Sequence, residues 1–253
     1  MKVTFLGTGT SQGVPVIACG CEVCASIDKK DKRLRSSILI TAPAGNIVVD
    51  TTPDFRYQML REKVGHLEAV LITHSHKDHI AGMDDIRAFN YFQRSAINIY
   101  ATEFSQTVIK REFAYAFSDF KYPGIPEINL RNIPGESFDI NGLPVTPIQV
   151  MHHKMPVMGF RVHDFTYITD ANYIAPEEKD KIRGSKILVL NALRKEKHIS
   201  HFTLDEAIEL GRELEIPQVY FTHISHQLGL HEEVSKELPA GMALAYDGLS
   251  LEI

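Results

Sequence analysis

Short apolar runs recur along this chain of 253 residues and alternate with segments of helical periodicity. Residues 69–73, 187–190 and 218–221 are rich in β-branched and aliphatic side chains, which is typical of buried strands. Residues 36–41 and 46–51 flank an Ala-Pro-Ala-Gly turn and predict a hairpin. Further strands are expected at residues 1–6, 97–101, 128–133, 145–151, 158–163 and 165–169.

Helices are expected between several of these strands, near Pro53 and over residues 84–89, 103–119 and 204–214. The last of these begins after Thr203 and carries Glu206 three residues further on, which predicts a capping box. A loop containing prolines is expected at residues 121–126.

Two of the helices show a clear apolar face. Phe55, Met59 and Leu60 provide it in the helix near Pro53. In the helix at 103–119 it consists of aromatic and aliphatic residues that we assign to the core in preference to a ligand site, namely Phe104, Val108, Phe113 and Phe117.

Polar or ligand-type residues follow the apolar bodies of five predicted strands. These strand ends carry His74, His152, Asp170, Asn191 and His223. A scaffold of sheets brings strand ends together along one edge, so we expect a functional site there.

The densest group of such residues is the segment from Thr73 to His79, which reads T-H-S-H-K-D-H. Three imidazoles and a carboxylate within six positions suit two divalent cations held close together. In an extended segment His74 and His76 point the same way, while Asp78 and His79 turn to the other side as a helix begins. Histidines that are only solvated or hydrogen-bonded are the less favoured alternative at this spacing.

All three cysteines of the chain, Cys19, Cys21 and Cys24, lie within six positions. They cannot form a closed disulfide framework, and as thiolates they need one more ligand to complete a tetrahedral zinc site. A histidine elsewhere would have to supply it. Three free thiols in a loop are the alternative.

Three other features each allow two interpretations. Asp50 ends an apolar strand and either orients a histidine ligand or caps the helix near Pro53. The glycine-rich stretch 7–15 is either an anion-binding loop or a tight turn. The basic stretch 29–35 is either a solvated loop or a phosphate-steering patch.

Composition narrows the class of protein. A hydrophobic content of 44% over 253 residues fits one large domain spanning residues 1–253, with the cysteine loop at about 19–24. The net charge of −5 argues against long nucleic acid as a partner. No apolar run approaches the ~18 residues that span a bilayer. We therefore expect a cytoplasmic protein without a membrane partner, and its oligomeric state stays open, a homodimer included.

These motifs together resemble those of the metallo-β-lactamase superfamily. The resemblance runs from Phe5-Leu6-Gly7-Thr8-Gly9 to Tyr246-Asp247-Gly248 and includes the cysteine loop, H-x-H-x-D-H, KMPVMGFR at 154–161, Thr169-Asp170 and T-H-I-S-H at 222–226. Within the superfamily the chain looks most like the phosphonate-pathway cyclic phosphodiesterases, which resemble tRNase Z but carry an added zinc loop. The fold implied is an α/β class protein, an αβ/βα four-layer sandwich of two mixed β-sheets flanked by helices.

The resemblance also implies residue roles. One metal would be held by His74, His76 and His152, a second by Asp78, His79 and His223, with Asp170 bridging both. His226 would complete a structural zinc site with Cys19, Cys21 and Cys24. His152 is favoured over the adjacent His153, and His201 over His198 as the catalytic histidine. The paired site suits zinc, manganese or iron.

The expected activity is metal-dependent hydrolysis of a small phosphodiester, with a cyclic ester favoured. Two cations would lower the pKa of a bridging water and neutralise charge on the phosphoryl oxygens during attack by hydroxide. The catalytic residues are then Asp78, within the metal site, and His201, which would stabilise the developing charge or protonate the leaving alkoxide. The alternatives are a tRNA 3′-processing nuclease, a thioester or lactam hydrolase, and a non-catalytic metal-binding protein.

Overall fold

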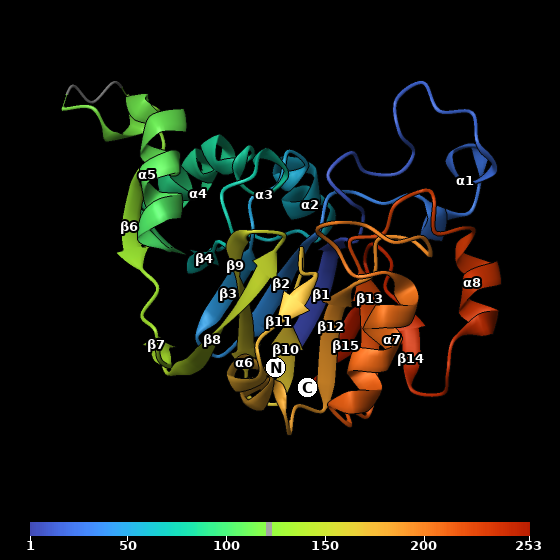
Figure 1. Ribbon diagram of the computed structural model, residues 1–253. Coiled ribbons are helices and arrows are strands. Elements are labelled where there is room, and N and C mark those ends of the chain that lie inside the picture. The colour runs from blue at the N-terminus through green and yellow to red at the C-terminus, as the bar shows by residue number, and fades with distance from the viewer. Residues whose placement is uncertain (120–122) are drawn as a thin grey trace.

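Two β-sheets packed face to face, with helices on their outer faces, form the body of the protein (Figure 1). The computed structural model describes residues 1–119 and 123–253. Lys121 and Tyr122, in the loop expected at 121–126, lie outside the described residues. The fold class predicted from the sequence is confirmed.

The first sheet has the strand order β15-β1-β2-β3-β4-β5-β6. Its strands are β1 (Lys2–Gly7), β2 (Ser37–Ala42), β3 (Gly45–Val49), β4 (Ala69–Leu71), β5 (Ile97–Ala101), β6 (Ile128–Asn132) and β15 (Ser250–Glu252). The predicted β2–β3 hairpin is antiparallel, with Ile38 opposite Val49, whereas β3 to β6 are parallel.

The second sheet has the order β11-β8-β9-β10-β12-β13-β14, and β7 pairs with β8. Its strands are β7 (Phe138–Ile140), β8 (Leu143–His152), β9 (Met155–Val162), β10 (Phe165–Tyr167), β11 (Tyr173–Ile174), β12 (Ile187–Asn191), β13 (Gln218–Thr222) and β14 (Met242–Leu244). The strands β10, β12, β13 and β14 run parallel.

The continuous apolar runs are explained by burial of both faces of each sheet. In β4, Ala69 and Leu71 face the core between the two sheets, while Val70 packs toward the outer helices. In β12, Val189 faces the same inner core, while Leu188 packs outward. Because successive side chains of a strand alternate, a strand covered on both sides must be apolar at every position.

Helices cover the outer faces. On the first sheet these are α2 (Phe55–Arg61), α3 (Lys77–Ile80), η2 (Met83–Ile86), α4 (Arg87–Gln93), α5 (Glu103–Glu112) and η3 (Ala114–Phe117). On the second sheet they are α6 (Pro176–Ile182), α7 (Leu204–Glu213) and α8 (His231–Glu237). The capping box of α7 is confirmed, with Thr203 and Glu206 exchanging hydrogen bonds. Within the described residues, no helix is long and apolar enough to cross a membrane.

Two side chains assigned to helical core faces are placed elsewhere. Phe104 is 66% exposed, so the prediction of a core position is wrong for this residue, and Leu60, which was expected on the apolar face of its helix, is 59% exposed. Phe55 and Phe113 are buried as expected. Helical periodicity identifies an apolar face but not what covers it, and Phe104, in the first turn of α5, lines a pocket.

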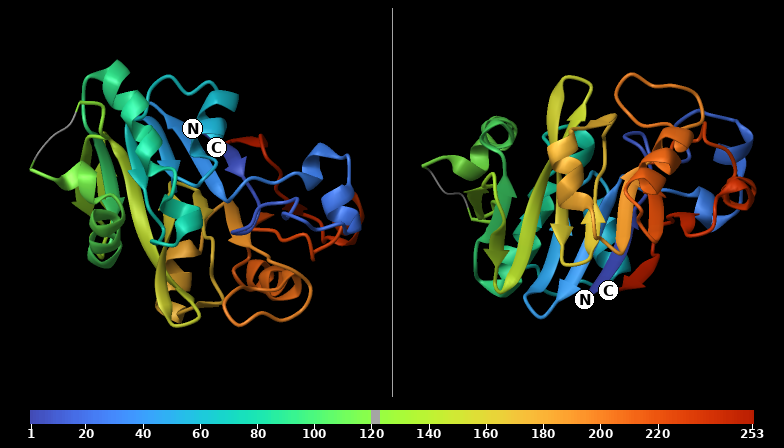
Figure 2. Two further views of the ribbon diagram at one scale, coloured as in Figure 1. Left: turned by 90° about the horizontal axis from the view of Figure 1, so that it is seen from above. Right: turned by 60° about the horizontal axis from the view of Figure 1, so that its bottom comes forward.

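The two ends of the chain lie side by side (Figure 2). The Met1 amino group donates to the Ile253 carbonyl over 2.9 Å, and β1 pairs with β15. The sequence did not predict β14, β15, α6 or α8. The extent of one domain over residues 1–253 stays a prediction.

Candidate metal centre

The site is built where strands of both sheets end at one rim. Asp50 follows β3, Asp170 lies three residues beyond β10, and His223 follows β13. All three residues have left-handed backbone angles, with φ values of 68°, 55° and 56°. Such angles are uncommon in residues other than glycine, and here they turn each side chain sharply from its strand toward the rim.

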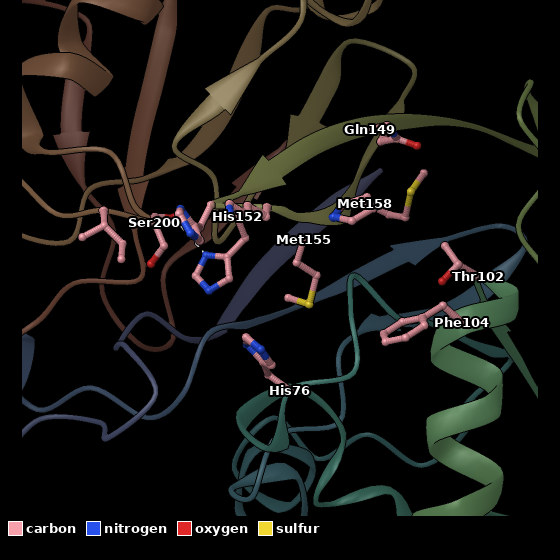
Figure 3. Close-up of a pocket in the computed structure, with 12 residues that line it drawn as sticks. His76, Thr102, Phe104, Gln149, His152, Met155, Met158 and Ser200 are labelled. Carbon is pink, nitrogen blue, oxygen red and sulfur yellow. Dashed lines mark hydrogen bonds between the residues drawn. The ribbon is translucent and has the colours of Figure 1, made fainter.

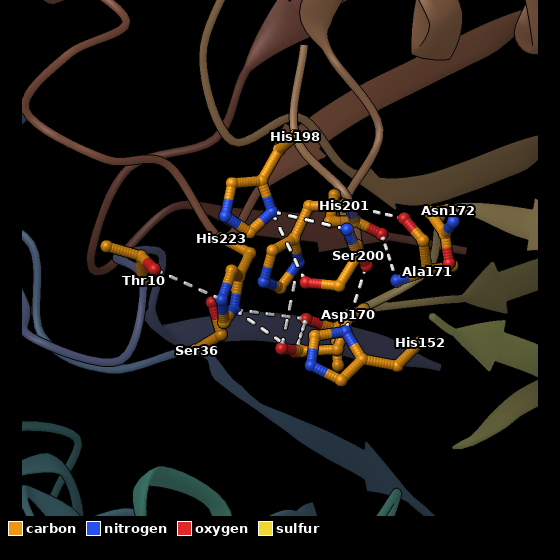
Figure 4. A network of polar contacts seen from close by, with 12 residues as sticks. Thr10, Ser36, His152, Asp170, Ala171, Asn172, His198, Ser200, His201 and His223 are labelled. Atoms are coloured by element: carbon orange, nitrogen blue, oxygen red, sulfur yellow. Dashed lines mark hydrogen bonds and ion pairs between the residues drawn. The ribbon is translucent and has the colours of Figure 1, made fainter. Parts of the chain in front are cut away.

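Asp170 lies at the centre of the cluster (Figure 4). Its Oδ2 atom is 3.3 Å from His79 Nε2 and 3.2 Å from His223 Nδ1. Asp78 Oδ2 lies 3.1 Å from the same His79 nitrogen. Four ligands bound tetrahedrally at ~2.0–2.1 Å would be separated by about 3.3 Å, so these separations suit one cation.

A second group of imidazoles lies beside the first. The ring of His76 is 4.6 Å from that of His74 and 5.3 Å from that of His152. His152 Nδ1 faces the Ser200 carbonyl at 2.9 Å. The adjacent His153 is exposed in the β8–β9 turn, so the structure places His152, and not His153, in the cluster.

Several of these nitrogens are buried without a hydrogen bond. His74 Nε2 and His201 Nδ1 make none to any described residue, and His79 Nε2 faces only the carboxylates of Asp78 and Asp170. Buried polar atoms are normally paired, because an unpaired one costs about 1–3 kcal/mol. Imidazole nitrogens that converge on two carboxylates in this way form a donor set that fits divalent cations.

Hydrogen bonds behind the imidazoles of the cluster fix their orientation. Asp50 accepts from the Thr73 amide and hydroxyl, each over 2.8 Å, and its Oδ2 lies 2.7 Å from His79 Nδ1. The Thr73 hydroxyl also lies 3.0 Å from His74 Nδ1. Of the two roles considered for Asp50, the structure shows the orienting one, since the N-cap of α2 is Asp54. Sequence reasoning missed Thr73 and Ser200, because a hydroxyl or carbonyl behind a ligand leaves no motif.

Burial and mutual contacts set the protonation of the cluster. Burial, followed by the neighbouring His79, lowers the pKa of His74 well below its usual value, and burial also lowers the pKa of His223. Burial would raise the pKa of Asp170, but His223 and His79 hold it well below its usual value. Burial opposes protonation of His79, yet Asp78, Asp170 and Asp50 raise its pKa. Neutral imidazoles and ionised carboxylates are the forms that bind metals.

His201 lies at the edge of this cluster. Its Nδ1 atom is 3.9 Å from Asp170 Oδ1, and its ring stacks on that of His223 at 4.9 Å. Burial and then His223 lower the pKa of His201 to about 3. His198 lies further out and accepts a hydrogen bond from the Ser200 amide. Asn191, at another strand end, binds the Ala171 backbone and is not part of the cluster.

The cysteine loop converges on His226, three residues after His223. The Nδ1 atom of His226 is 3.4 Å from Cys19 Sγ, 3.3 Å from Cys21 Sγ and 3.6 Å from Cys24 Sγ. Zinc bound at ~2.3 Å to sulfur and ~2.0–2.1 Å to nitrogen gives a tetrahedral S···N edge of about 3.6 Å. The arrangement therefore fits a zinc ion.

The glycine-rich stretch packs closely against the chain. A Cβ on Gly7 would lie 1.9 Å from the Arg35 carbonyl oxygen, and one on Gly9 would lie 2.9 Å from the Arg33 Cβ. These contacts favour the tight-turn interpretation over an anion-binding loop.

The basic stretch at 29–35 is mostly engaged within the structure. The Arg33 guanidinium is buried and donates to the Thr8 hydroxyl and the Ala245 carbonyl. Arg35 pairs with Asp54. None of the five cations of the stretch is among the described residues that line the pocket beside His76.

A pocket of about 840 Å³ opens directly beside the metal cluster (Figure 3). His76 and His152 form one end of its wall. The rest of the lining comes from the β8–β9 hairpin, the start of α5 and the segment before His201, with the residues Thr102, Phe104, Gln149, His153, Lys154, Met155, Pro156, Met158, Ile199 and Ser200. Its volume lies within the ~300–1,000 Å³ range of small-molecule sites.

Comparison with known proteins agrees with this architecture. Residues 45–224 match the family described as beta-lactamase superfamily domain. The chain belongs to the beta-lactamase superfamily. The family predicted from the motifs is thus confirmed, and so at this level is the prediction of a metal-dependent hydrolase.

The proteins similar to this chain are named for different activities. A crystal structure of a diphosphatase from the PhnP family is 39% identical, with a TM-score of 0.93 and coverage of 100% of this chain and 97% of that one. A Porphyromonas gingivalis protein named octanoyltransferase is 37% identical over 98% of this chain and 51% of its own length. Ribonuclease Z of a Nostoc species is 30% identical over 64% of this chain and 46% of its own length. The chain thus spans about half the length of these two curated relatives.

The contacts of Asp50 generate a testable prediction. We expect Asp50→Asn to weaken metal binding about 10- to 100-fold, because the amide cannot serve both Thr73 donors and the His79 ring as the carboxylate does. Metal content after dialysis against a weak chelator measures this. Asp164→Asn, in an exposed ion pair with Lys186, is the control. Unchanged metal retention in Asp50→Asn would show that His79 needs no such support.

Proposed function

We propose that the protein is a dinuclear-metal-dependent phosphodiesterase that hydrolyses a small phosphodiester, with a cyclic ester favoured over a linear one. The observation that carries this proposal is the position of the cluster around Asp170, whose outer imidazoles His76 and His152 form the end wall of an open pocket. A PhnP-family diphosphatase is 39% identical to this chain, and the match covers 97% of that protein. This similarity supports phosphoryl chemistry.

The proposed ligand sets share Asp170, which lies within 4.8 Å of ligand atoms of His74 and His79, of Asp78 and His223, and of His152 and His201. His74, His76 and His152 would hold one cation, and Asp78, His79 and His223 the other, with Asp170 shared between them. Two divalent cations of zinc, manganese or iron would supply Lewis-acid charge and a water of lowered pKa. In the proposed hydrolysis the water oxygen would bond to phosphorus and the ester P–O bond would break, and the proton lost by the water would balance the one that the leaving alkoxide takes up.

His201 would act on the substrate and not as a metal ligand. With its pKa lowered to about 3, the ring is neutral and retains one N–H donor. That donor would stabilise the charge that develops on the phosphoryl group.

A small substrate is favoured over a long nucleic acid. Among the described residues that line the pocket, Lys154 is the single lysine or arginine. Binding of a long polyanion depends on several phosphate contacts from such cations. The single cation in the pocket lining therefore counts against the tRNA-processing alternative.

A cytoplasmic location and a homodimer stay predictions.

A second candidate is hydrolysis of an acyl thioester, which the same fold permits. It is favoured by the apolar wall of the pocket at Met155 and Met158, and by the name octanoyltransferase of the Porphyromonas relative. The first activity assay should therefore include an octanoyl thioester as well as the phosphodiester.

The proposed function predicts the effect of His76→Ala. The metal-loaded protein should hydrolyse bis(p-nitrophenyl) phosphate, and the variant should lose this activity with its circular dichroism unchanged, since one ligand of the cluster is gone. His66→Ala, at an exposed position, is the control. Full activity in His76→Ala, or hydrolysis of the thioester alone, would refute the phosphodiesterase assignment.

His201→Ala distinguishes a catalytic role from ligation. We expect turnover to fall by about 10²- to 10⁴-fold, with the metal content of the protein unchanged. His198→Ala is the matched control, because that ring lies 5.1 Å from the His201 ring but outside the cluster. Loss of metal from His201→Ala would instead make His201 a ligand.

We further propose that Cys19, Cys21, Cys24 and His226 hold a structural zinc. The Cys24 amide and His226 lower the pKa of Cys21 to about 6, which favours its thiolate. Cys21→Ser should lower metal content by about one equivalent and lower the unfolding temperature. Ile27→Ser, at a 99% exposed position of the same segment, should change neither quantity. Equal metal content in Cys21→Ser and the wild type would contradict the zinc site.

A further inference from the structure

The glycine-rich stretch 7–15 carries a hydroxyl group that contacts the metal cluster. The Thr10 Oγ1 atom lies 3.3 Å from His223 Nε2. The other ring nitrogen of His223, Nδ1, lies 3.2 Å from Asp170 Oδ2. Figure 4 shows Thr10 and Asp170 on opposite sides of the His223 ring, so both nitrogens of this imidazole have a partner. The sequence predicted no contact between Thr10 and the histidines.

Backbone hydrogen bonds fix Thr10 against the segment that carries His223. The Ile224 amide donates to the Thr8 carbonyl over 2.9 Å, and the Thr10 amide donates to the Ile224 carbonyl over 3.1 Å. His223 itself has the left-handed φ of 56°. Such a conformation persists where the surrounding structure holds it from several sides, and these two hydrogen bonds hold it from the side of the glycine-rich stretch.

The glycine next to Thr10 makes this approach possible. Gly9 forms a parallel bridge to Ile224 on one side. On the other side, a Cβ atom on Gly9 would lie 2.9 Å from the Arg33 carbonyl oxygen. Only a residue without a side chain fits where two backbones come this close. The tight turn of the stretch therefore brings the Thr10 hydroxyl to the ring of His223.

The two ring contacts determine the tautomer of a neutral His223. An ionised carboxylate only accepts hydrogen bonds, so Nδ1 carries the ring proton where it faces Asp170, and Nε2 accepts from the Thr10 hydroxyl. A cation on Nδ1 would reverse these roles. The ring proton must then lie on Nε2, and the Thr10 oxygen must accept it. A hydroxyl can donate or accept by rotating, so Thr10 suits both forms of the ring.

We propose that Thr10 is a positioning residue of the metal centre, whose hydroxyl oxygen accepts the Nε2 proton of His223 when Nδ1 binds a cation. This inference rests on the ligand sets proposed for the phosphodiesterase and adds the group that selects the tautomer and the ring orientation of one ligand. Among the described residues, the Thr10 side chain hydrogen-bonds to His223 alone. Its loss should therefore affect the cation held by Asp78, His79 and His223, and neither the other cation nor the cysteine zinc.

Substitutions that separate the hydroxyl from the methyl group of Thr10 test this role. In Thr10→Val, zinc affinity at one of the two cluster sites should fall at least about tenfold, measured by competition with a chromophoric chelator, with circular dichroism unchanged. Thr10→Ser keeps the hydroxyl and should bind zinc as the wild type does. Ser11→Ala, at the exposed neighbouring position, is the control. Wild-type affinity in Thr10→Val would overturn the inference, as would an equal loss in Thr10→Ser, because the hydroxyl would then not be the group that acts.

The position of the ring proton gives a readout that does not depend on activity. In zinc-loaded protein labelled with ¹⁵N in histidine, two-bond ¹H–¹⁵N correlation should show His223 bound through Nδ1 and protonated at Nε2. A proton on Nδ1 of the loaded protein would place the metal on Nε2 and overturn the inference. If the loaded protein does not hydrolyse bis(p-nitrophenyl) phosphate, the phosphodiesterase function fails, and the zinc and NMR measurements still decide the role of Thr10. A wild type that binds zinc only at the cysteines would overturn both proposals.

Discussion

The burial of Asp170 among imidazoles is the constraint on which the structure depends. Its carboxylate is nearly inaccessible to solvent, and His79 and His223 approach it to within 3.3 Å. Taking such a charge out of water costs several kcal/mol unless opposite charge compensates it. Asp170 and the other carboxylates raise the pKa of His79, and a positive charge on that ring would compensate part of this cost, as bound cations would. Both sheets must end at the same rim for this cluster to exist, so the site requires the sandwich.

Most of this cluster could be predicted because local chemistry and strand periodicity point to the same place. His74, His76 and His79 form a dense motif after an apolar strand, and the structure brings their rings together. Asp170 and His223 are each isolated in sequence, but both follow apolar strands. The ends of parallel strands share one edge of a sheet, so pattern alone places such residues near one another. The individual contacts between carboxylate oxygens and imidazole nitrogens could be assigned only from the structure.

The failures of prediction have a common physical origin, since they depend on what packs against a residue from far along the chain. Phe104 has the spacing of a core residue, but it is 66% exposed and lines a pocket. Arg33 lies in a basic stretch that suggested solvent or phosphate, yet it is buried. Its partners include the Ala245 carbonyl, more than 200 positions away. No local pattern records a contact at that separation.

The left-handed backbone of Asp50, Asp170 and His223 has a consequence for the evolution of such a protein. Each residue holds a conformation that costs roughly 1–3 kcal/mol for a side chain of its kind. Glycine or asparagine would relieve that strain while removing a ligand or its support. Selection for thermal stability alone would therefore dismantle the site, and descendants that lost catalysis would be expected to carry glycine or asparagine at these three positions before the apolar strands changed.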